Sequence, residues 1–406
     1  MGVVDNIKSF HPPDLYVCLG PQMGVSMKKC IVIPDSFKGT LSSMEICEIM
    51  RNSIHKHYPD CEVIEIPIAD GGEGTVDCFL KTLRAEAIQI EAEGPYGDKI
   101  PVTYARMGDC AVIEVAAAAG LPMAERLNRL DPCHATTYGL GTIMKHAICS
   151  MKCRKLIIGL GGSCTNDGGI GMAKALGGRF YNKAGKEFFP AACEMEQIER
   201  MDISEIRKLT EGIEIIGMCD IDNPMFGTSG AAYVFGPQKG ADPDTVQLLD
   251  TQLKALAKAM ETSTGRDVSE LSGGGAAGGL GAGLAVFTEA TLKSGIQTLL
   301  ELVGFDELVQ DADMVFTGEG KLDVQSLRGK AVIGIAQRTK KYSIPVIAVV
   351  GAIGDGVEAA YDMGVSAVFS INRQPMPFDK ARHLSNTNLE GTMDNLLRYY
   401  KSTHGM

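Results

Sequence analysis

Residues 29–54 read KCIVIPDSFKGTLSSMEICEIMRNSI, and this stretch decides the fold class. Its β-branched start, residues 29–33, ends at Pro34, as expected of a buried parallel strand. Ser42 and Glu45 then form a capping-box pattern, and apolar residues follow at helical spacing. A strand, a polar loop and a helix in this order begin a βαβ unit, which predicts a parallel sheet.

The same alternation recurs at both ends of the chain. A second strand at 62–68 leads through a polar loop into a helix from about residue 76 to 83. Thr387 and Glu390 predict the cap of a final helix. Further buried parallel strands are expected at residues 313–317, 345–350 and 367–371.

The middle of the chain has a different sequence pattern, in which short expected strands are separated by turns. This pattern favours a mixed sheet. We therefore predict an α/β fold in which a Rossmann-like, three-layer domain with a parallel sheet is interrupted by an inserted α/β domain with a mixed sheet. The first domain is expected at 27–84 and 292–402, and the inserted one at 85–291. Residues 1–26 are expected to be an extension without a catalytic role. The strands of the middle region are expected at 88–93, 100–105, 111–115, 156–160 and 213–218.

The composition excludes several classes of function. The chain has 406 residues and a net charge of −11, which argues against a nucleic-acid or anionic-membrane partner. No apolar run approaches the roughly 20 residues of a membrane helix. The 12 cysteines are scattered without a Cys-x-x-Cys pair, so neither a zinc site nor disulfides are expected. Reduced cysteines predict a cytoplasmic location. The oligomeric state stays open, with a homodimer as one option.

Glycine is concentrated in two segments. Residues 159–178 contain 8 glycines and residues 273–283 contain 7, a density that does not suit a helix interior. Glycine either permits a positive φ or lets backbone N–H groups approach a ligand. For residues 273–283, a helix-packing surface and a phosphate cradle remain equal alternatives.

Five segments place ionisable or amide residues beside such loops, and four of them directly follow an expected strand. Ligands of open α/β sheets bind outside the carboxyl ends of the strands. Each segment alone could be a turn or a solvated loop. Gathered carboxylates would repel one another, however, unless a cation such as the magnesium ion carried by ATP binds among them. The segments are 35–39, 70–74, 161–169, 220–224 with 236–240, and 317–323.

Known nucleotide motifs are missing from the sequence. There is no Gly-x4-Gly-Lys-[Ser/Thr] loop, and residues 279–283 match a dinucleotide loop only weakly because they follow no clear strand. A nicotinamide-dependent hydroxy-acid dehydrogenase would need a Gly-rich turn directly after the first strand, where this chain has Asp-Ser-Phe-Lys-Gly. A non-catalytic regulatory protein that binds an organic acid is the other alternative.

Taken together and in order, these segments resemble the bacterial glycerate kinase family that is unrelated to the P-loop kinases. The resemblance begins at Met27 and covers nearly the whole remaining chain, although Cys164 and Cys219 stand where other small residues are expected. It implies phosphorylation of D-glycerate by ATP with Mg²⁺, giving 2-phosphoglycerate more often than the 3-phosphate. The matching segments are 33–39, 69–75, 161–169, 219–224, 236–241, 273–279 and 317–326.

Roles in phosphoryl transfer follow as hypotheses, because this reaction asks mainly for positioning and charge neutralisation. Lys38 is expected at the ATP phosphates, and either Asp167 or Asp220 is expected to accept the hydroxyl proton. The metal ligands expected through Mg-ATP are Asp70, Glu319 and Asp323. Closure of the two domains on the substrates is also expected. The expected substrate- and nucleotide-binding residues are Asp35, Ser36, Gly71, Gly72, Gly162, Ser163, Asn166, Asn223, Gly274 and Gly275.

Overall fold

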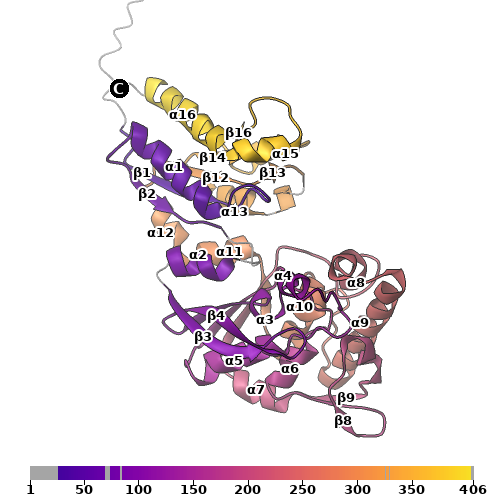
Figure 1. Cartoon of the computed structure of the whole chain (residues 1–406). Helices are drawn as coiled ribbons and strands as arrows, with labels where there is room; N and C mark the ends of the chain where they lie inside the picture. Colours follow the sequence, from indigo (N-terminus) through magenta and orange to yellow (C-terminus); the bar gives the residue numbers. More distant parts are fainter. Residues whose placement is uncertain (1–25, 69–73, 83–84, 325, 329, 404–406) are drawn as a thin grey trace, which may run out of the picture.

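The computed structural model describes residues 26–403 apart from 69–73, 83–84, 325 and 329, and its elements form two lobes (Figure 1). One lobe is built around a sheet of five parallel strands, in the order β16-β14-β12-β1-β2. Both ends of the chain supply this sheet, as predicted. Its strands are β1 Lys29–Pro34, β2 Glu62–Glu65, β12 Met314–Gly318, β14 Val346–Val350 and β16 Ala367–Ser370.

Helices cover both faces of this sheet because alternate residues of a buried strand point to opposite sides. Cys30 and Val32 of β1 belong to the core formed with α1 (Ser43–His57) and α16 (Ser385–Thr403). The intervening strand residues, Ile31 and Ile33, belong to the core formed with α11 (Gly295–Leu302) and α13 (Ala331–Thr339). The lobe is therefore the three-layer, Rossmann-like domain that the sequence predicts.

The two predicted helix caps have different outcomes. Ser42 caps α1 in a capping box, with its hydroxyl accepting from the Glu45 N–H and its own N–H donating to the Glu45 carboxylate. The cap predicted at Thr387 is wrong, because α16 already begins at Ser385 and Thr387 lies inside it. Ser385 is itself buried, so packing extends this helix past the local capping signal.

The second lobe contains a six-stranded mixed sheet in the order β11-β10-β6-β5-β4-β3. The β3–β4 and β4–β5 pairs are antiparallel, and the other pairs are parallel. A small antiparallel sheet, β8-β7-β9, flanks it. The strands are β3 Glu86–Glu93, β4 Lys99–Met107, β5 Cys110–Glu114, β6 Lys155–Gly159, β7 Arg179–Tyr181, β8 Glu187–Phe188, β9 Arg200–Asp202, β10 Glu214–Met218 and β11 Thr291–Lys293.

The second glycine-rich segment combines an irregular stretch with the start of a regular helix. Helix α10 spans Ala276–Phe287, with left-handed backbone at residues 277–279. A Cβ on Gly281 would lie 2.3 Å from the Gly273 carbonyl oxygen, and one on Gly283 would lie 2.3 Å from that of Gly168. These glycines let the helix pack directly on the first glycine-rich loop, which favours the packing-surface alternative.

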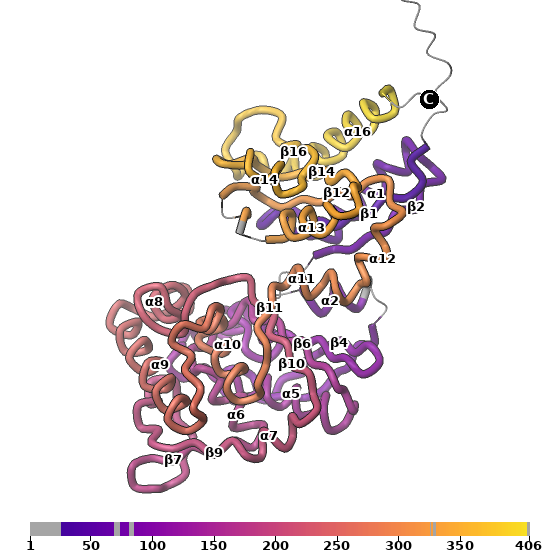
Figure 2. The backbone as a smooth tube through the Cα atoms, turned by 180° about the vertical axis from the view of Figure 1, so that it is seen from behind, coloured from indigo at the N-terminus to yellow at the C-terminus, as the bar shows by residue number. Residues whose placement is uncertain are grey.

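Two short helices lie between the sheets, α2 (Thr75–Thr82) and α11 (Figure 2). The N–H of Val76 in α2 donates to Glu114 at the end of β5, 2.6 Å away. No helix among the described residues is long and apolar enough to cross a membrane. The remaining helices are α3 Ala116–Ala119, α4 Leu121–Arg126, α5 Tyr138–Cys149, α6 Ile170–Ala175, α7 Ser204–Thr210, α8 Ala231–Phe235, α9 Pro243–Thr264, α12 Phe305–Val309, α14 Ala359–Asp362 and α15 Phe378–Ala381, and a two-stranded sheet pairs β13 Lys321–Leu322 with β15 Ala352–Ile353.

Candidate functional site

Two cavities share one residue, Asp220, which follows β10. Cavity 1, of about 270 Å³, lies in the lobe with the mixed sheet. Cavity 2, of about 570 Å³, lies against the parallel sheet and extends to Asp220 and Ile296. Both cavities sit beyond the carboxyl ends of parallel strands, where α/β sheets bind ligands.

Cavity 2 is built by the loops that follow β1 and β12. These neighbouring strands hold the loops together, and the Asp35 N–H donates to the Gly318 carbonyl, 2.8 Å away. Lys321 forms a salt bridge of 3.0 Å with Asp323. Besides Asp220, the predicted site residues that line this cavity are Asp35, Ser36, Lys38, Glu319 and Asp323, and Lys321 and Lys330 join them without having been predicted.

Glu319 is the carboxylate of cavity 2 that most needs a cation. Glu319 is 8% exposed, and its Oε1 has no hydrogen-bond partner among the described residues. Burial raises the pKa of Glu319 to about 7; a hydrogen bond from Ser326 opposes this shift, and the nearby charge of Asp35 adds to it. A positive ion beside this oxygen would satisfy it and restore the ionised form.

The residues of cavity 2 fit a magnesium ion that arrives with a nucleotide. No group of three or more metal-ligating side chains gathers among the described residues. Mg²⁺ usually keeps several waters and takes only one or two carboxylates besides substrate phosphates, so a complete protein cage is not required. Glu319 and Asp323 are carboxylates of this kind. The third predicted ligand, Asp70, lies outside the described residues, as do Gly71 and Gly72.

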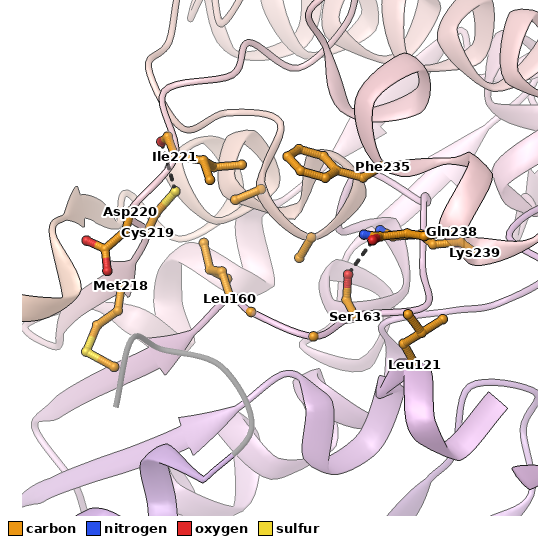
Figure 3. A pocket seen from close by; sticks show the side chains of 14 residues that line it. Leu121, Leu160, Ser163, Met218, Cys219, Asp220, Ile221, Phe235, Gln238 and Lys239 are labelled. Atoms are coloured by element: carbon orange, nitrogen blue, oxygen red, sulfur yellow. Dashed lines mark hydrogen bonds between the residues drawn. The ribbon is translucent and has the colours of Figure 1, made fainter. Parts of the chain in front are cut away.

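Cavity 1 is built by the loop after β6 and by a turn after α8. Gly162 has φ +72°, a left-handed conformation that favours glycine, and Ser163 follows it. The Lys239 ammonium donates to the Ser163 hydroxyl, 3.2 Å away (Figure 3). It also donates to the Thr165 carbonyl, 2.7 Å away. Besides Asp220, the predicted residues Gly162 and Ser163 therefore line this cavity, beside a lysine that was not predicted.

Lys239 is almost fully buried, with 2% of its surface exposed. Burial lowers the pKa of Lys239 to about 8, while Cys164 and Asp167 oppose the shift. Sequence reasoning singled out segment 236–240 but assigned this lysine no role, because lysine is normally exposed. The glycine that follows it, Gly240, was a usable signal of a tight turn. Gly240 has φ +97°, and a Cβ added there would lie 2.4 Å from the Leu130 carbonyl oxygen.

Asp167, one of the two candidate bases, lies in the protein interior and does not appear in the lining of either cavity. It accepts hydrogen bonds from the Thr137 N–H at 2.8 Å and hydroxyl at 2.9 Å, and from the N–H groups of Gly169 at 3.0 Å and Gly171 at 3.2 Å. Burial raises the pKa of Asp167, and these hydrogen bonds oppose the rise. The carboxylate joins the glycine-rich loop to the start of α5.

Asp220, the other candidate base, is exposed where the cavities meet. Its Oδ1 accepts from the Gly295 N–H at 2.8 Å and from the Ser294 hydroxyl at 2.9 Å. The Asp220 carboxylate thereby caps the start of α11. The cap fixes the position of the carboxylate at the edge of both cavities. Of the two candidates, Asp220 is therefore the one with access to a ligand.

Four further candidates lie away from the linings of both cavities. Asn166 is fully buried, and neither atom of its amide has a hydrogen-bond partner among the described residues. The Asn223 amide donates to the Ser229 carbonyl. The N–H groups of Gly274 and Gly275 donate to the carbonyls of Leu271 and Asn223, so they are engaged within the protein.

Comparisons with known proteins agree along the whole described chain. The sequence profile of the glycerate kinase family matches residues 30–401. A protein of Bacillus subtilis named glycerate kinase is 40% identical over 355 residues, covering 87% of this chain and 92% of that protein. An Escherichia coli protein named glycerate 2-kinase is 36% identical over 372 residues, covering 91% of this chain and 95% of that protein.

A solved structure leads to the same result. The crystal structure assigned to glycerate kinase 2 of Salmonella typhimurium LT2 superposes with a TM-score of 0.80 at 36% identity, and covers 93% of this chain and 99% of that one. At this identity the likeness extends beyond the fold to the family. The chain therefore belongs to the glycerate kinase family and is a kinase, an enzyme that transfers phosphoryl groups.

Proposed function

We propose that the chain transfers the γ-phosphoryl group of ATP to a hydroxyl of D-glycerate and forms 2-phosphoglycerate. One observation carries the proposal, namely that Asp220 belongs to two adjoining cavities of different chemistry. A transferase with two substrates needs two such sites and a point at which they meet. The name of the Escherichia coli relative, glycerate 2-kinase, supports the 2-phosphate as the product.

Cavity 2 is the proposed site of Mg-ATP. Lys38 and Lys330 offer cationic groups for the phosphates, and Ser36 offers a hydroxyl. Glu319 and Asp323 are the described carboxylates that would hold magnesium, and the bound ion would neutralise charge on the phosphates. A protein contributes to phosphoryl transfer mainly in this way, by positioning and neutralising charge.

Cavity 1 is the proposed site of the acid. Its polar end, with Gly162 and Ser163, offers a hydroxyl and a glycine turn to a small polar ligand. Asp220 lies where the phosphoryl group crosses from one cavity to the other. There it can accept the hydroxyl proton or face the metal ion beside the phosphates, and its replacement by Asn removes either function. Asp167 has a structural role in this proposal.

Closure of the lobes is part of the proposal, because groups from both lobes line cavity 2 and closure would exclude water from the transfer. Small-angle scattering should show a smaller radius of gyration with D-glycerate and a non-hydrolysable ATP analogue together than with neither. An unchanged radius would contradict closure. A cytoplasmic location is also proposed, in keeping with the free thiols of the described cysteines.

The direct test is a measurement of ADP formation with ATP, Mg²⁺ and D-glycerate, followed by phosphorus NMR of the product. We expect ADP release that depends on the acid. The phosphorus of 2-phosphoglycerate couples to one proton and that of 3-phosphoglycerate to two, so the splitting identifies the product. Binding of D-glycerate without ADP release would indicate a regulatory protein instead. A change in nicotinamide absorbance with hydroxy acids would indicate a dehydrogenase.

A further inference from the structure

A buried cation without an opposite charge lies at one end of cavity 1. Lys239 forms no salt bridge with any residue in the described part of the chain. Its two hydrogen bonds go to neutral oxygens, the Ser163 hydroxyl and the Thr165 carbonyl. An ammonium group has three donors, and a buried charge is unfavourable unless it is paired. This end of the cavity is therefore suited to an anionic group.

The groups around Lys239 do not supply that anion. The Cys164 thiol is neutral, because burial raises the pKa of Cys164 to about 11. The Asp167 carboxylate is already bound by the hydrogen bonds of Thr137 and of the glycine-rich loop. Figure 3 shows Asp220 at the opposite end of the cavity from Lys239. Asp167 acts on the pKa of Lys239 through its charge but forms no ion pair with it in the described part of the chain, so a ligand can still supply a paired anion.

The walls of cavity 1 strengthen such a charge interaction. Leu121, Leu160 and Phe235 line it, and apolar side chains beside two charges strengthen the attraction between them. Among the described lining residues Lys239 is the single cationic side chain. One cation in an apolar cavity of this size suits a small ligand with one carboxylate and disfavours a second negative charge.

We propose that Lys239 binds the carboxylate of the acid substrate, so that a small hydroxy monocarboxylate enters cavity 1 with its carboxylate first and its hydroxyls toward Asp220. The inference rests on the proposed function, which supplies the acid. A phosphate oxygen of the nucleotide has the same chemistry, and the experiment separates these two sources.

The experiment compares Lys239→Met, which shortens the side chain by one heavy atom and removes the charge, with Lys254→Met, a matched change of an exposed lysine on α9 in the same lobe. Steady-state kinetics are measured with D-glycerate, with its neutral analogue D-glyceramide and with ATP. In Lys239→Met we expect KM for D-glycerate to rise about 10- to 100-fold, the loss typical of a hydrogen bond to a charged group. KM for ATP and for D-glyceramide should change less than about twofold, and Lys254→Met should resemble the unmodified protein.

Thermal unfolding gives a readout that does not need catalysis. D-Glycerate alone should raise the melting temperature of the unmodified protein and of Lys254→Met, but not that of Lys239→Met, because a ligand stabilises only the state that binds it. Without ligand, Lys239→Met should melt no lower than the unmodified protein, since it removes an unpaired buried charge. A structural lysine would give the opposite result, a lower melting temperature and equal losses with both acceptors.

Three outcomes overturn the inference: an unchanged KM for D-glycerate, a raised KM for ATP instead, or equal losses with D-glycerate and D-glyceramide. If the unmodified protein forms no ADP with D-glycerate, the proposed function fails. The inference still stands in that case if Lys239→Met abolishes the D-glycerate shift in melting temperature.

If Lys239→Met does not fold, calorimetry on the unmodified protein takes its place. The pKa of Lys239, lowered to about 8 by burial, means that the ammonium form is lost above that pH. A bound carboxylate favours the ammonium form, so D-glycerate affinity should be constant below about pH 7.5 and fall about tenfold per unit well above pH 8. The Cys164 thiol does not produce this fall, because burial raises the pKa of Cys164 to about 11. Asp167 and Asp220 are the other charged groups near cavity 1. A constant affinity up to pH 10 would overturn the inference.

Discussion

Cavity 1 and cavity 2 lie beyond the ends of parallel strands in their own sheets, yet their charged side chains differ in number and kind. Cavity 1 has apolar walls and one buried ammonium group, whereas cavity 2 gathers several carboxylates and lysines around a glutamate oxygen without a partner. An isolated charge in an apolar cavity selects a ligand, whereas mixed charges neutralise a highly charged one. The same strand-end position thus serves selection in one lobe and charge neutralisation in the other.

The junction of the two cavities should give the largest effect. Asp220→Asn should lower kcat with D-glycerate and ATP by about 10²- to 10⁴-fold, the range for loss of a proton-accepting group. The Asn oxygen can still accept from Gly295, so the melting temperature should change little. The control is Asp222→Asn, which changes an exposed carboxylate two residues away and should keep its rate. A normal kcat in Asp220→Asn would show that the cavities do not meet at this carboxylate.

The packing behind cavity 1 should be nearly as sensitive. Gly278 has φ +71°, and a Cβ there would lie 2.1 Å from the Thr165 carbonyl oxygen. Gly278→Ala should lower the free energy of unfolding by about 2–5 kcal/mol, combining the left-handed backbone with overpacking. Gly212→Ala is the control, because Gly212 also has a positive φ, of +70°, but open space around it. Calorimetry should show that this control loses about 1–2 kcal/mol of unfolding free energy. Equal losses in both variants would mean that the close contact at Gly278 adds nothing to stability.

Asp167 should affect stability and leave the chemical step nearly intact. The Asp167 carboxylate accepts hydrogen bonds from the N–H groups of Thr137, Gly169 and Gly171. Asp167→Asn replaces one carboxylate oxygen by an NH₂ group, which cannot accept from these donors. We expect a loss of about 1.5–3 kcal/mol in unfolding free energy, the value for hydrogen bonds to a charged acceptor. Saturating substrates at a temperature well below unfolding should give a kcat near that of the unmodified protein. A loss as large as that of Asp220→Asn would make Asp167 a catalytic group.

The smallest expected effect concerns cavity 2 alone. Glu319→Gln removes the charge that would hold magnesium, and should raise the Mg²⁺ concentration needed for half-maximal activity at least about tenfold, in line with changes around other metal sites. KM for D-glycerate should stay within about twofold, because Glu319 does not line cavity 1. Titration of Mg²⁺ at fixed ATP measures the first quantity, and titration of D-glycerate at saturating Mg²⁺ measures the second. A raised KM for D-glycerate instead would contradict the assignment of the metal to cavity 2 and of the acid to cavity 1.

Much of the fold could be predicted because its information is local. The runs that became β6, β10, β12 and β14 are short, apolar and rich in β-branched residues, which is typical of strands buried on both faces. The glycine-rich segment 273–283 was harder, because its glycines are needed for close contact with Gly168 and Gly273, residues far away or across a turn. No pattern within the segment reveals that contact.

The candidate site could be predicted only in part, for a related reason. Strand-end loops mark which residues can meet, and Asp35, Lys38 and Glu319 do line one cavity. Burial depends on packing between distant segments and is not written in the local sequence. For that reason Asp167 and Asp220 looked alike as candidates, although one is enclosed and the other exposed. Lys239 was missed because the neighbouring Gly240 indicates a tight turn but does not by itself show that the lysine is enclosed.

The pairing of β1 with β12 constrains how the protein is made. Cys30 of β1 lies opposite Met314 of β12. Strand β12 is therefore synthesised, and can pair with β1, only after the strands of the mixed-sheet lobe. The interrupted lobe is therefore completed last, and its first strands wait with one edge and apolar faces uncovered. A nascent chain that stalls before residue 314 carries a complete mixed sheet beside an unfinished parallel one, and that unfinished edge is where chaperones should bind and where aggregation should begin.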